Sequence, residues 1–166
     1  TSLFLNDYHV KNTFCSSIQD LNFLGFSDVI EQGKIVVLNL NIADYQNLSK
    51  VIAAYLKLDF QTEVMSRLAN PYASKRSVCF ISDEFHEYVT ASDASFFAQS
   101  REAKCINIIA TQSYTSLLHT LKDSSCVKVI IQNLINKLWF RTDDIFTIED
   151  AQKQIGKQDK VRITKT

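Results

Sequence analysis

One short stretch constrains this chain more than any other. The apolar run 78–81 is followed by Ser82 and by two adjacent carboxylates, Asp83 and Glu84. A short apolar run that ends abruptly in charge is typical of a buried strand in a parallel sheet. Ligands of open α/β sheets bind beyond the carboxyl ends of the strands. The stretch therefore predicts an inner strand with two acids at the ligand-binding edge of a sheet.

Two acids at this position suit a task in nucleotide chemistry. Asp83 could hold a Mg2+ ion through water, and Glu84 could polarise the water molecule that attacks a phosphate. An apolar strand followed by two acids is the Walker B pattern of nucleoside triphosphatases. The alternative is structural, because a strand that ends in Asp-Glu is often only a strand with a solvated end.

A second apolar run, 106–110, also ends in polar residues, among them Gln112. In many nucleoside triphosphatases a polar residue at the tip of the neighbouring strand senses the terminal phosphate. We therefore expect Gln112 to lie beside Asp83 and Glu84 in one sheet.

Arg101 is informative through its position in the chain. It precedes the second strand, whereas Gln112 follows it, and a strand of five or six residues spans roughly 17–20 Å. Arg101 is therefore expected far from its own Asp83, where it could reach the nucleotide of a neighbouring subunit in a ring. Such an arginine finger stabilises charge on the transferring phosphoryl group. The alternative is a surface arginine that pairs with an acid or complements a helix C-terminus.

The other elements predict an alternation of strands and helices. Further strands are expected at 35–40, 138–140 and 161–163. Helices are expected at about 46–68, 90–103, 114–121, 127–135 and 147–156. This alternation with short loops predicts a three-layer α/β fold, with a mostly parallel sheet and helices on both faces.

Composition narrows the class of protein. The 166 residues suffice for one domain with a sizeable core, and 18 basic against 18 acidic side chains give no electrostatic sign of nucleic-acid binding. No apolar run approaches the ~18 residues of a membrane span, and no signal peptide opens the chain. The four cysteines form no CxxC pair, which favours reduced thiols in a cytosolic protein over a metal site.

Several segments together resemble the carboxyl-terminal half of the RecA-like motor domain of the FtsK–HerA superfamily. Within it they are most similar to type IV coupling proteins, the TraD/TraG-like DNA pumps of bacterial conjugation. The resemblance is carried by the order and spacing of 78–88, 100–102, 109–113 and 133–141. The run 33–40 also resembles the segment that re-enters the motor core of this family after an all-α insertion.

This resemblance implies a membrane-anchored hexameric ATPase that threads DNA, or a relaxase–DNA complex, toward a secretion channel. ATP and Mg2+ would be its cofactors, and this chain would be part of the cytoplasmic domain of a bacterial inner-membrane protein. Residues 1–33 would be lead-in helices or the end of the all-α insertion, to which the family assigns recognition of accessory proteins or substrate. Residues 34–166 would be the carboxyl-terminal half of the nucleotide-binding domain.

The resemblance also assigns roles to single residues. Its Walker B acids correspond to Asp83, which would hold Mg2+ through water, and to the catalytic Glu84. Its sensor glutamine corresponds to Gln112, and its finger arginine to Arg101.

The phosphate-binding loop is the main departure from this family. No GxxxxGK[ST] motif occurs, since the glycines stand only at 25, 33 and 156. Without that loop nothing cradles the β- and γ-phosphates. We therefore expect a fragment that hydrolyses ATP negligibly, with the phosphate loop and the membrane anchor upstream in the intact protein.

Two other interpretations stay open. Residues 83–86 also spell the DExH box of a helicase, and 110–111 resemble the end of its later Ser-Ala-Thr motif, although Ile109 replaces the serine. A helicase would carry a second RecA-like domain on the same chain. Alternatively, the chain is a non-catalytic module that binds accessory proteins or a relaxase through exposed apolar surface on residues 1–33.

Overall fold

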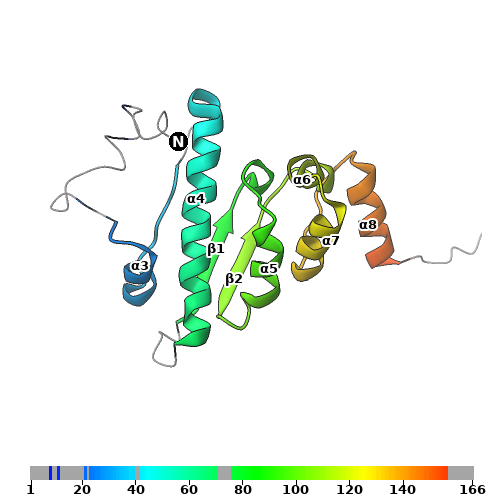
Figure 1. Ribbon diagram of the computed structural model, residues 1–166. Coiled ribbons are helices and arrows are strands. Elements are labelled where there is room, and N and C mark those ends of the chain that lie inside the picture. The colour runs from blue at the N-terminus through cyan, green and yellow to red at the C-terminus, as the bar shows by residue number, and fades with distance from the viewer. Residues whose placement is uncertain are drawn as a thin grey trace, which may run out of the picture.

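The computed structural model describes residues 8, 11, 21, 23–39, 42–70 and 76–156. In chain order its elements are α3 (Phe26–Gln32), α4 (Ile42–Ala69), β1 (Val78–Ser82), the 3-10 turn η2 (Phe85–Glu87), α5 (Ser92–Gln99), β2 (Cys105–Ile109), α6 (Tyr114–Leu121), α7 (Ser124–Asn133) and α8 (Ile145–Ile155) (Figure 1). The described chain is therefore an α/β protein with a two-stranded parallel sheet.

The two strands lie in the positions that the sequence predicts, to within one residue. They pair in parallel, with Val78 opposite Cys105 and Ser82 opposite Ile109. The chain passes from one strand to the next through η2 and α5, because a parallel pair needs a crossover connection. Two hydrogen bonds continue the pairing beyond the strands, from the amide of Ala110 to Ser82 O at 2.8 Å and from the amide of Phe85 to Ala110 O at 3.0 Å. The segments that follow β1 and β2 therefore meet at one edge of the sheet.

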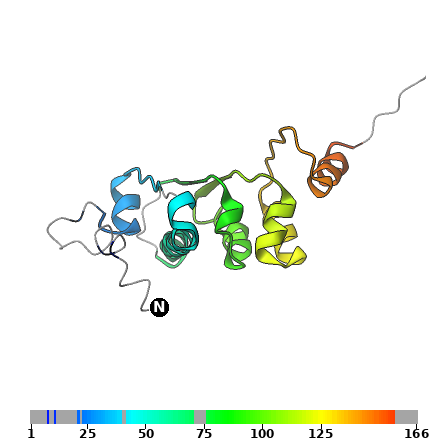
Figure 2. The ribbon, with the colours of Figure 1, turned by 90° about the horizontal axis from the view of Figure 1, so that it is seen from above.

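The hydrophobic core lies on one face of the sheet, where α4, α5 and α7 pack (Figure 2). Four side chains in it have no exposed surface, Val64 of α4, Phe85 of η2, and Val127 and Ile130 of α7. A chain of ring contacts, with centroids 5.0–5.4 Å apart, fastens α3 and α4 to β1 and consists of Phe23, Phe26, Phe60 and Phe80. Contacts between these aromatic rings thus hold α3 and α4 against one face of β1.

The opposite face of the sheet is uncovered in the part of the chain that the structure describes. Ile81, Ile106 and Ile108 point to this face and are 71%, 55% and 52% exposed. The prediction of helices on both faces is therefore not confirmed for the described residues. A right-handed crossover places its helix on a fixed side of the sheet, and the single described step from β1 to β2 goes through α5, so it covers one face.

Two of the predicted strands are wrong. Residues 34–39 form no ladder, and Ile35 and Val37 are 90% and 81% exposed. Residues 138–140 also lie outside any strand, and Leu138 is 89% exposed. Branched and aromatic side chains favour an extended backbone, but a strand also needs a neighbour that completes its hydrogen bonds. The predicted strand 161–163 lies outside the described residues.

The predicted helices are all present, with shifted ends. α4 begins at Ile42, and α5 is shorter than predicted, ending at Gln99. Asp123 caps α7 by accepting from the amides of Ser125 and Cys126. α8 begins at Ile145, before Thr147, because Asp144 caps it, and it ends at Ile155, with Gly156 at φ 83° as its C-cap. No helix among the described residues combines the length and apolarity needed to cross a membrane.

Candidate functional site

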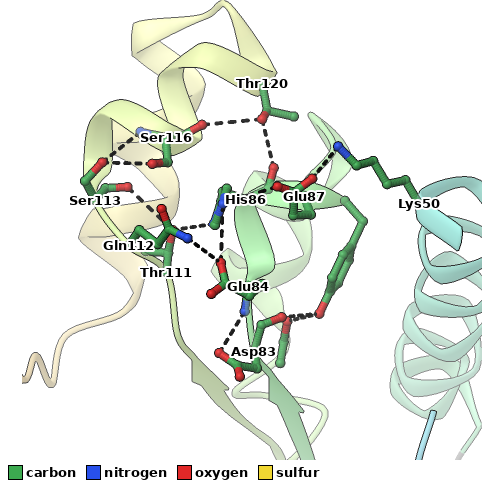
Figure 3. A network of polar contacts seen from close by, with 12 residues as sticks. Lys50, Asp83, Glu84, His86, Glu87, Thr111, Gln112, Ser113, Ser116 and Thr120 are labelled. Atoms are coloured by element: carbon green, nitrogen blue, oxygen red, sulfur yellow. Dashed lines mark hydrogen bonds and ion pairs between the residues drawn. The ribbon is translucent and has the colours of Figure 1, made fainter. Parts of the chain in front are cut away.

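Polar side chains from the ends of β1 and β2 converge at the carboxyl edge of the sheet (Figure 3). The amide nitrogen Nε2 of Gln112 donates to Oε2 of Glu84 at 3.2 Å. The two residues are 28 positions apart in sequence, and the parallel pairing of the strands brings them together. The structure therefore places Gln112 in contact with Glu84, at the edge where ligands of such sheets bind.

Glu84 has an unusual backbone conformation. Its φ of 48° and ψ of 39° lie in the left-handed region, which costs a residue with a Cβ roughly 1–2 kcal/mol. Its own amide is held by Oδ1 of Asp83 at 2.9 Å. Strained backbone of this kind persists only where the surroundings hold it, and it occurs often at functional sites. The turn aims the Glu84 carboxylate toward β2 and Gln112 (Figure 3).

Tyr88 and Ser82 fix the end of β1 below the acids. The Tyr88 hydroxyl has one hydrogen and donates it to the carbonyl oxygen of Asp83 at 2.8 Å. Ser82 Oγ, which lies 2.6 Å from the same hydroxyl, must therefore be the donor of that second bond. Burial raises the pKa of Tyr88, so the hydroxyl stays protonated and keeps donating at neutral pH.

Asp83 is the residue available for a magnesium ion. Its carboxylate is exposed and uses one oxygen, Oδ1, to accept from the amide of Glu84. The described residues contain no group of three or more metal-binding side chains. Mg2+ often keeps several waters and takes only one or two carboxylates together with substrate phosphates. A single exposed carboxylate fits that mode, so Asp83 would hold the ion together with a bound nucleotide.

His86 and Thr111 also belong to this site, and the sequence singled them out only under the DExH helicase alternative. Nδ1 of His86 lies 3.2 Å from Oγ1 of Thr111, and Nε2 lies 3.4 Å from Oε2 of Glu84. His86 is 8% exposed and sits in η2, between the ends of the two strands. In the sequence, the signal for His86 is its position two residues after Glu84. The left-handed turn at Glu84, which directs the His86 ring into the site, cannot be read from the sequence.

Glu87 connects the site to α4. It forms an ion pair with Lys50, and the hydrogen bond from this lysine is the main reason why the pKa of Glu87 is lowered. Its other oxygen lies 3.6 Å from Nε2 of His86. The short turn η2 is thus held from the helix on one side and from β2 on the other.

Arg101 lies away from this constellation. It follows α5 and precedes β2, in the turn where its carbonyl oxygen accepts from the amide of Lys104 at 3.0 Å. Gln112 follows the other end of the same strand. Arg101 is exposed at the edge of the sheet opposite Glu84 and Gln112. The structure therefore brings together Asp83, Glu84 and Gln112, and it separates Arg101 from them.

A hollow of about 610 Å³ lies elsewhere, between α7 and α8, with Ile131, Ile135 and Phe146 in its lining. Its lining contains none of the residues at the carboxyl edge of the sheet. Asp83 is exposed and the Glu84 side chain is 46% exposed, so the two acids stand at an open edge.

Comparison of the chain with models of protein families, with curated proteins and with solved structures found no match. A function therefore has to be argued from the residues themselves.

Proposed function

We propose that this chain is the carboxyl-terminal half of a RecA-like motor domain in an ATP-driven coupling protein of conjugation, which pumps DNA or a relaxase–DNA complex. The observation that carries the proposal is the 3.2 Å contact between Gln112 Nε2 and Glu84 Oε2 across the ends of two parallel strands. An acid that orients water and an amide that meets the terminal phosphate are needed side by side for phosphoryl transfer to water.

Each residue of the site has a role in this proposal. Glu84 accepts a proton from the attacking water, and Gln112 contacts the terminal phosphate. Asp83 would hold Mg2+ through water, and the ion would supply positive charge that stabilises the transferring phosphoryl group. Arg101 lies at the opposite edge of the sheet and acts on the nucleotide of the next subunit in a hexamer.

The uncovered sheet face supports the same proposal. Parallel sheets are normally buried on both faces, and here Ile81, Ile106 and Ile108 are more than half exposed. In the proposed three-layer core, the other half of the motor domain covers this face and supplies the phosphate-binding loop. The membrane anchor, the hexamer and the bacterial cytoplasmic location belong to the same proposal.

The test is ATP hydrolysis by the intact polypeptide that contains this chain. We expect a turnover of about 1 s−1 or more, and we expect Glu84→Gln to lower it by about 10²- to 10⁴-fold, because the proton acceptor is lost. Glu102→Gln is the matched control, since this exposed acid lies outside the site. The chain of 166 residues alone should show negligible turnover. A turnover near 1 s−1 by this chain alone that vanished in Glu84→Gln would contradict the proposed fragment.

A mixing experiment tests Arg101. Arg101→Ala and Glu84→Gln should each inactivate a uniform assembly. An assembly that contains both variants should regain part of the activity, because an intact pocket of one subunit meets an intact arginine of its neighbour. If mixing restores nothing while the assemblies remain hexameric, Arg101 is not a finger that acts in trans.

A DExH-type helicase is the second candidate. The contact between His86 Nδ1 and Thr111 Oγ1, at 3.2 Å, favours it because it joins the two segments that resemble helicase motifs. Strand separation distinguishes the two candidates. A helicase would unwind a duplex that carries a single-stranded tail in the presence of ATP, whereas a coupling protein would move along the duplex and leave it paired.

A further inference from the structure

His86 has all its polar ring atoms directed at the candidate site. Nε2 lies 3.4 Å from Oε2 of Glu84 and 3.6 Å from Oε1 of Glu87, and Nδ1 lies 3.2 Å from Oγ1 of Thr111 (Figure 3). The backbone that carries the ring is also held, because the hydroxyl of Thr120 donates to the carbonyl oxygen of His86 at 2.8 Å. A histidine that only filled the core would not need two carboxylates and a hydroxyl at its nitrogens.

These neighbouring groups determine which ring nitrogen of neutral His86 carries the hydrogen. A lone pair on Nε2 would face two carboxylate oxygens and be repelled, so Nε2 must carry a hydrogen in both the neutral and the charged ring. In the neutral ring, Nδ1 is then an acceptor, and the hydroxyl of Thr111 donates to it at 3.2 Å in preference to the carbonyl oxygen of Ser113, which lies farther away at 3.5 Å. His86 therefore directs its Nε2–H at the carboxylates of Glu84 and Glu87, as an electrostatic contact at 3.4 and 3.6 Å, and accepts a hydrogen bond from Thr111 at the end of β2.

The two oxygens of Glu84 are consequently unequal. Oε2 is approached by Nε2 of Gln112 at 3.2 Å and by Nε2 of His86 at 3.4 Å. Both contacts go to Oε2, and the Glu84 side chain is 46% exposed. A general base needs one oxygen directed at the water that it deprotonates, and Oε1 is left for that task.

We propose that His86 is the positioning residue of Glu84: together with Gln112 it holds Oε2, so that Oε1 faces the attacking water, and through Thr111 it links this carboxylate to the tip of β2. The role of Glu84 in this statement rests on the proposed function. The charged groups around the ring are Glu84 and Glu87, and Lys50 of α4 offsets the latter by pairing with it.

Two measurements test the proposal. The first is the nitrogen spectrum of the histidine rings in the 166-residue chain. We expect neutral His86 to carry its hydrogen on Nε2. Glu84→Gln should change the Nε2 signal of His86, and Thr111→Val its Nδ1 signal. The exposed His119 is the internal reference and should not respond. A hydrogen on Nδ1, or a His86 signal that ignores Glu84→Gln, would overturn the proposal.

The second measurement is ATP hydrolysis by the intact polypeptide. His86→Ala should lower kcat by about 10- to 100-fold, as is typical for a residue that orients a catalytic group, with little change in KM. His86→Gln restores an N–H donor at the same reach and should recover part of kcat, while His119→Ala should behave as wild type. Wild-type kcat in His86→Ala alongside an inactive Glu84→Gln would overturn the proposal. If the wild type hydrolyses no ATP, the proposed function fails, and the ring spectrum alone decides whether His86 positions Glu84.

Discussion

Lys57 of α4 carries its ammonium group into the interior, where it is 4% exposed. It donates to Oδ2 of Asp93 at 2.5 Å, to the carbonyl oxygen of Tyr88 at 2.8 Å and to Oγ1 of Thr90 at 3.2 Å. The other oxygen of Asp93 accepts from Gln61 at 2.6 Å. Burial lowers the pKa of Lys57, and the charge of Asp93 opposes that effect. This cluster ties the long helix to the segment that follows the candidate site.

The Lys57–Asp93 pair gives a stability prediction. Asp93→Asn leaves a buried ammonium without its counter-charge and should lower the free energy of unfolding by about 3–5 kcal/mol. Adding Lys57→Met should recover part of this loss, because the uncompensated charge is then removed. Urea unfolding of the two single variants and the double variant measures both effects. Lys50→Met, which removes the more exposed pair with Glu87, is the control and should cost about 1 kcal/mol or less. Strictly additive losses in the double variant would contradict this account.

Among the elements, α8 shows how a single side chain sets a helix start. Asp144 accepts from the amide of Thr147 at 2.9 Å and from its hydroxyl at 2.6 Å. It also accepts from the hydroxyl of Thr115 in α6 at 2.5 Å. Burial raises the pKa of Asp144, but the hydrogen bonds from Thr115 and Thr147 outweigh it, so that the pKa lies below its usual 3.8. One carboxylate thus caps α8 and docks it against α6.

Asp144→Ala should destabilise the chain by about 1 kcal/mol at neutral pH, which is the usual contribution of a helix cap. Because the folded pKa is depressed, the carboxylate stabilises the chain at pH values above about 3.8, and this contribution is lost as the pH falls through the folded pKa. The stability difference between wild type and variant should therefore shrink in acid. Chemical unfolding at pH 7 and at several pH values below 4 measures it. The neighbouring Asp143→Ala is the control, since Asp143 is exposed. A difference that stays constant into acid would argue against a charged cap.

The same elements show what the sequence could predict. The cap of α7 was predictable only to within the residues 123–125, which precede an apolar helical pattern, and the structure has Asp123 as the cap. The sequence places the start of α8 at Thr147, because Thr147 and Asp150 have the spacing of a capping box. In the structure Asp144 is the N-cap and accepts from the amide of Thr147. The proximity of Glu84 and Gln112 was predictable from the ends of the two strands, since parallel pairing alone brings those ends together. Strands at 35–40 and 138–140 failed because strand formation depends on a neighbour that local sequence does not specify.

At the scale of the whole molecule, the two faces of the sheet differ in their environment. Cys79 of β1 is exposed on the open face, opposite Ile106 of β2. Cys105 lies on the covered face and is buried. The two thiols lie on opposite faces of the paired strands. The accessibility of each thiol therefore reports whether its own face of the sheet is covered.

Thiol labelling of the 166-residue chain should distinguish these faces. Burial raises the pKa of Cys105 to about 12, so at pH 8 only about 10⁻⁴ of it is the reactive thiolate. Cys79 is accessible and should be alkylated at least about 100-fold faster than Cys105. Peptide mass spectrometry after timed quenching measures both rates in one sample. Unfolding in urea is the control, because it should make the two rates similar. Equal, slow labelling of both thiols in the folded chain would mean that the second face of the sheet is covered as well. The missing half of a three-layer core would then not be needed to cover the isoleucines on that face.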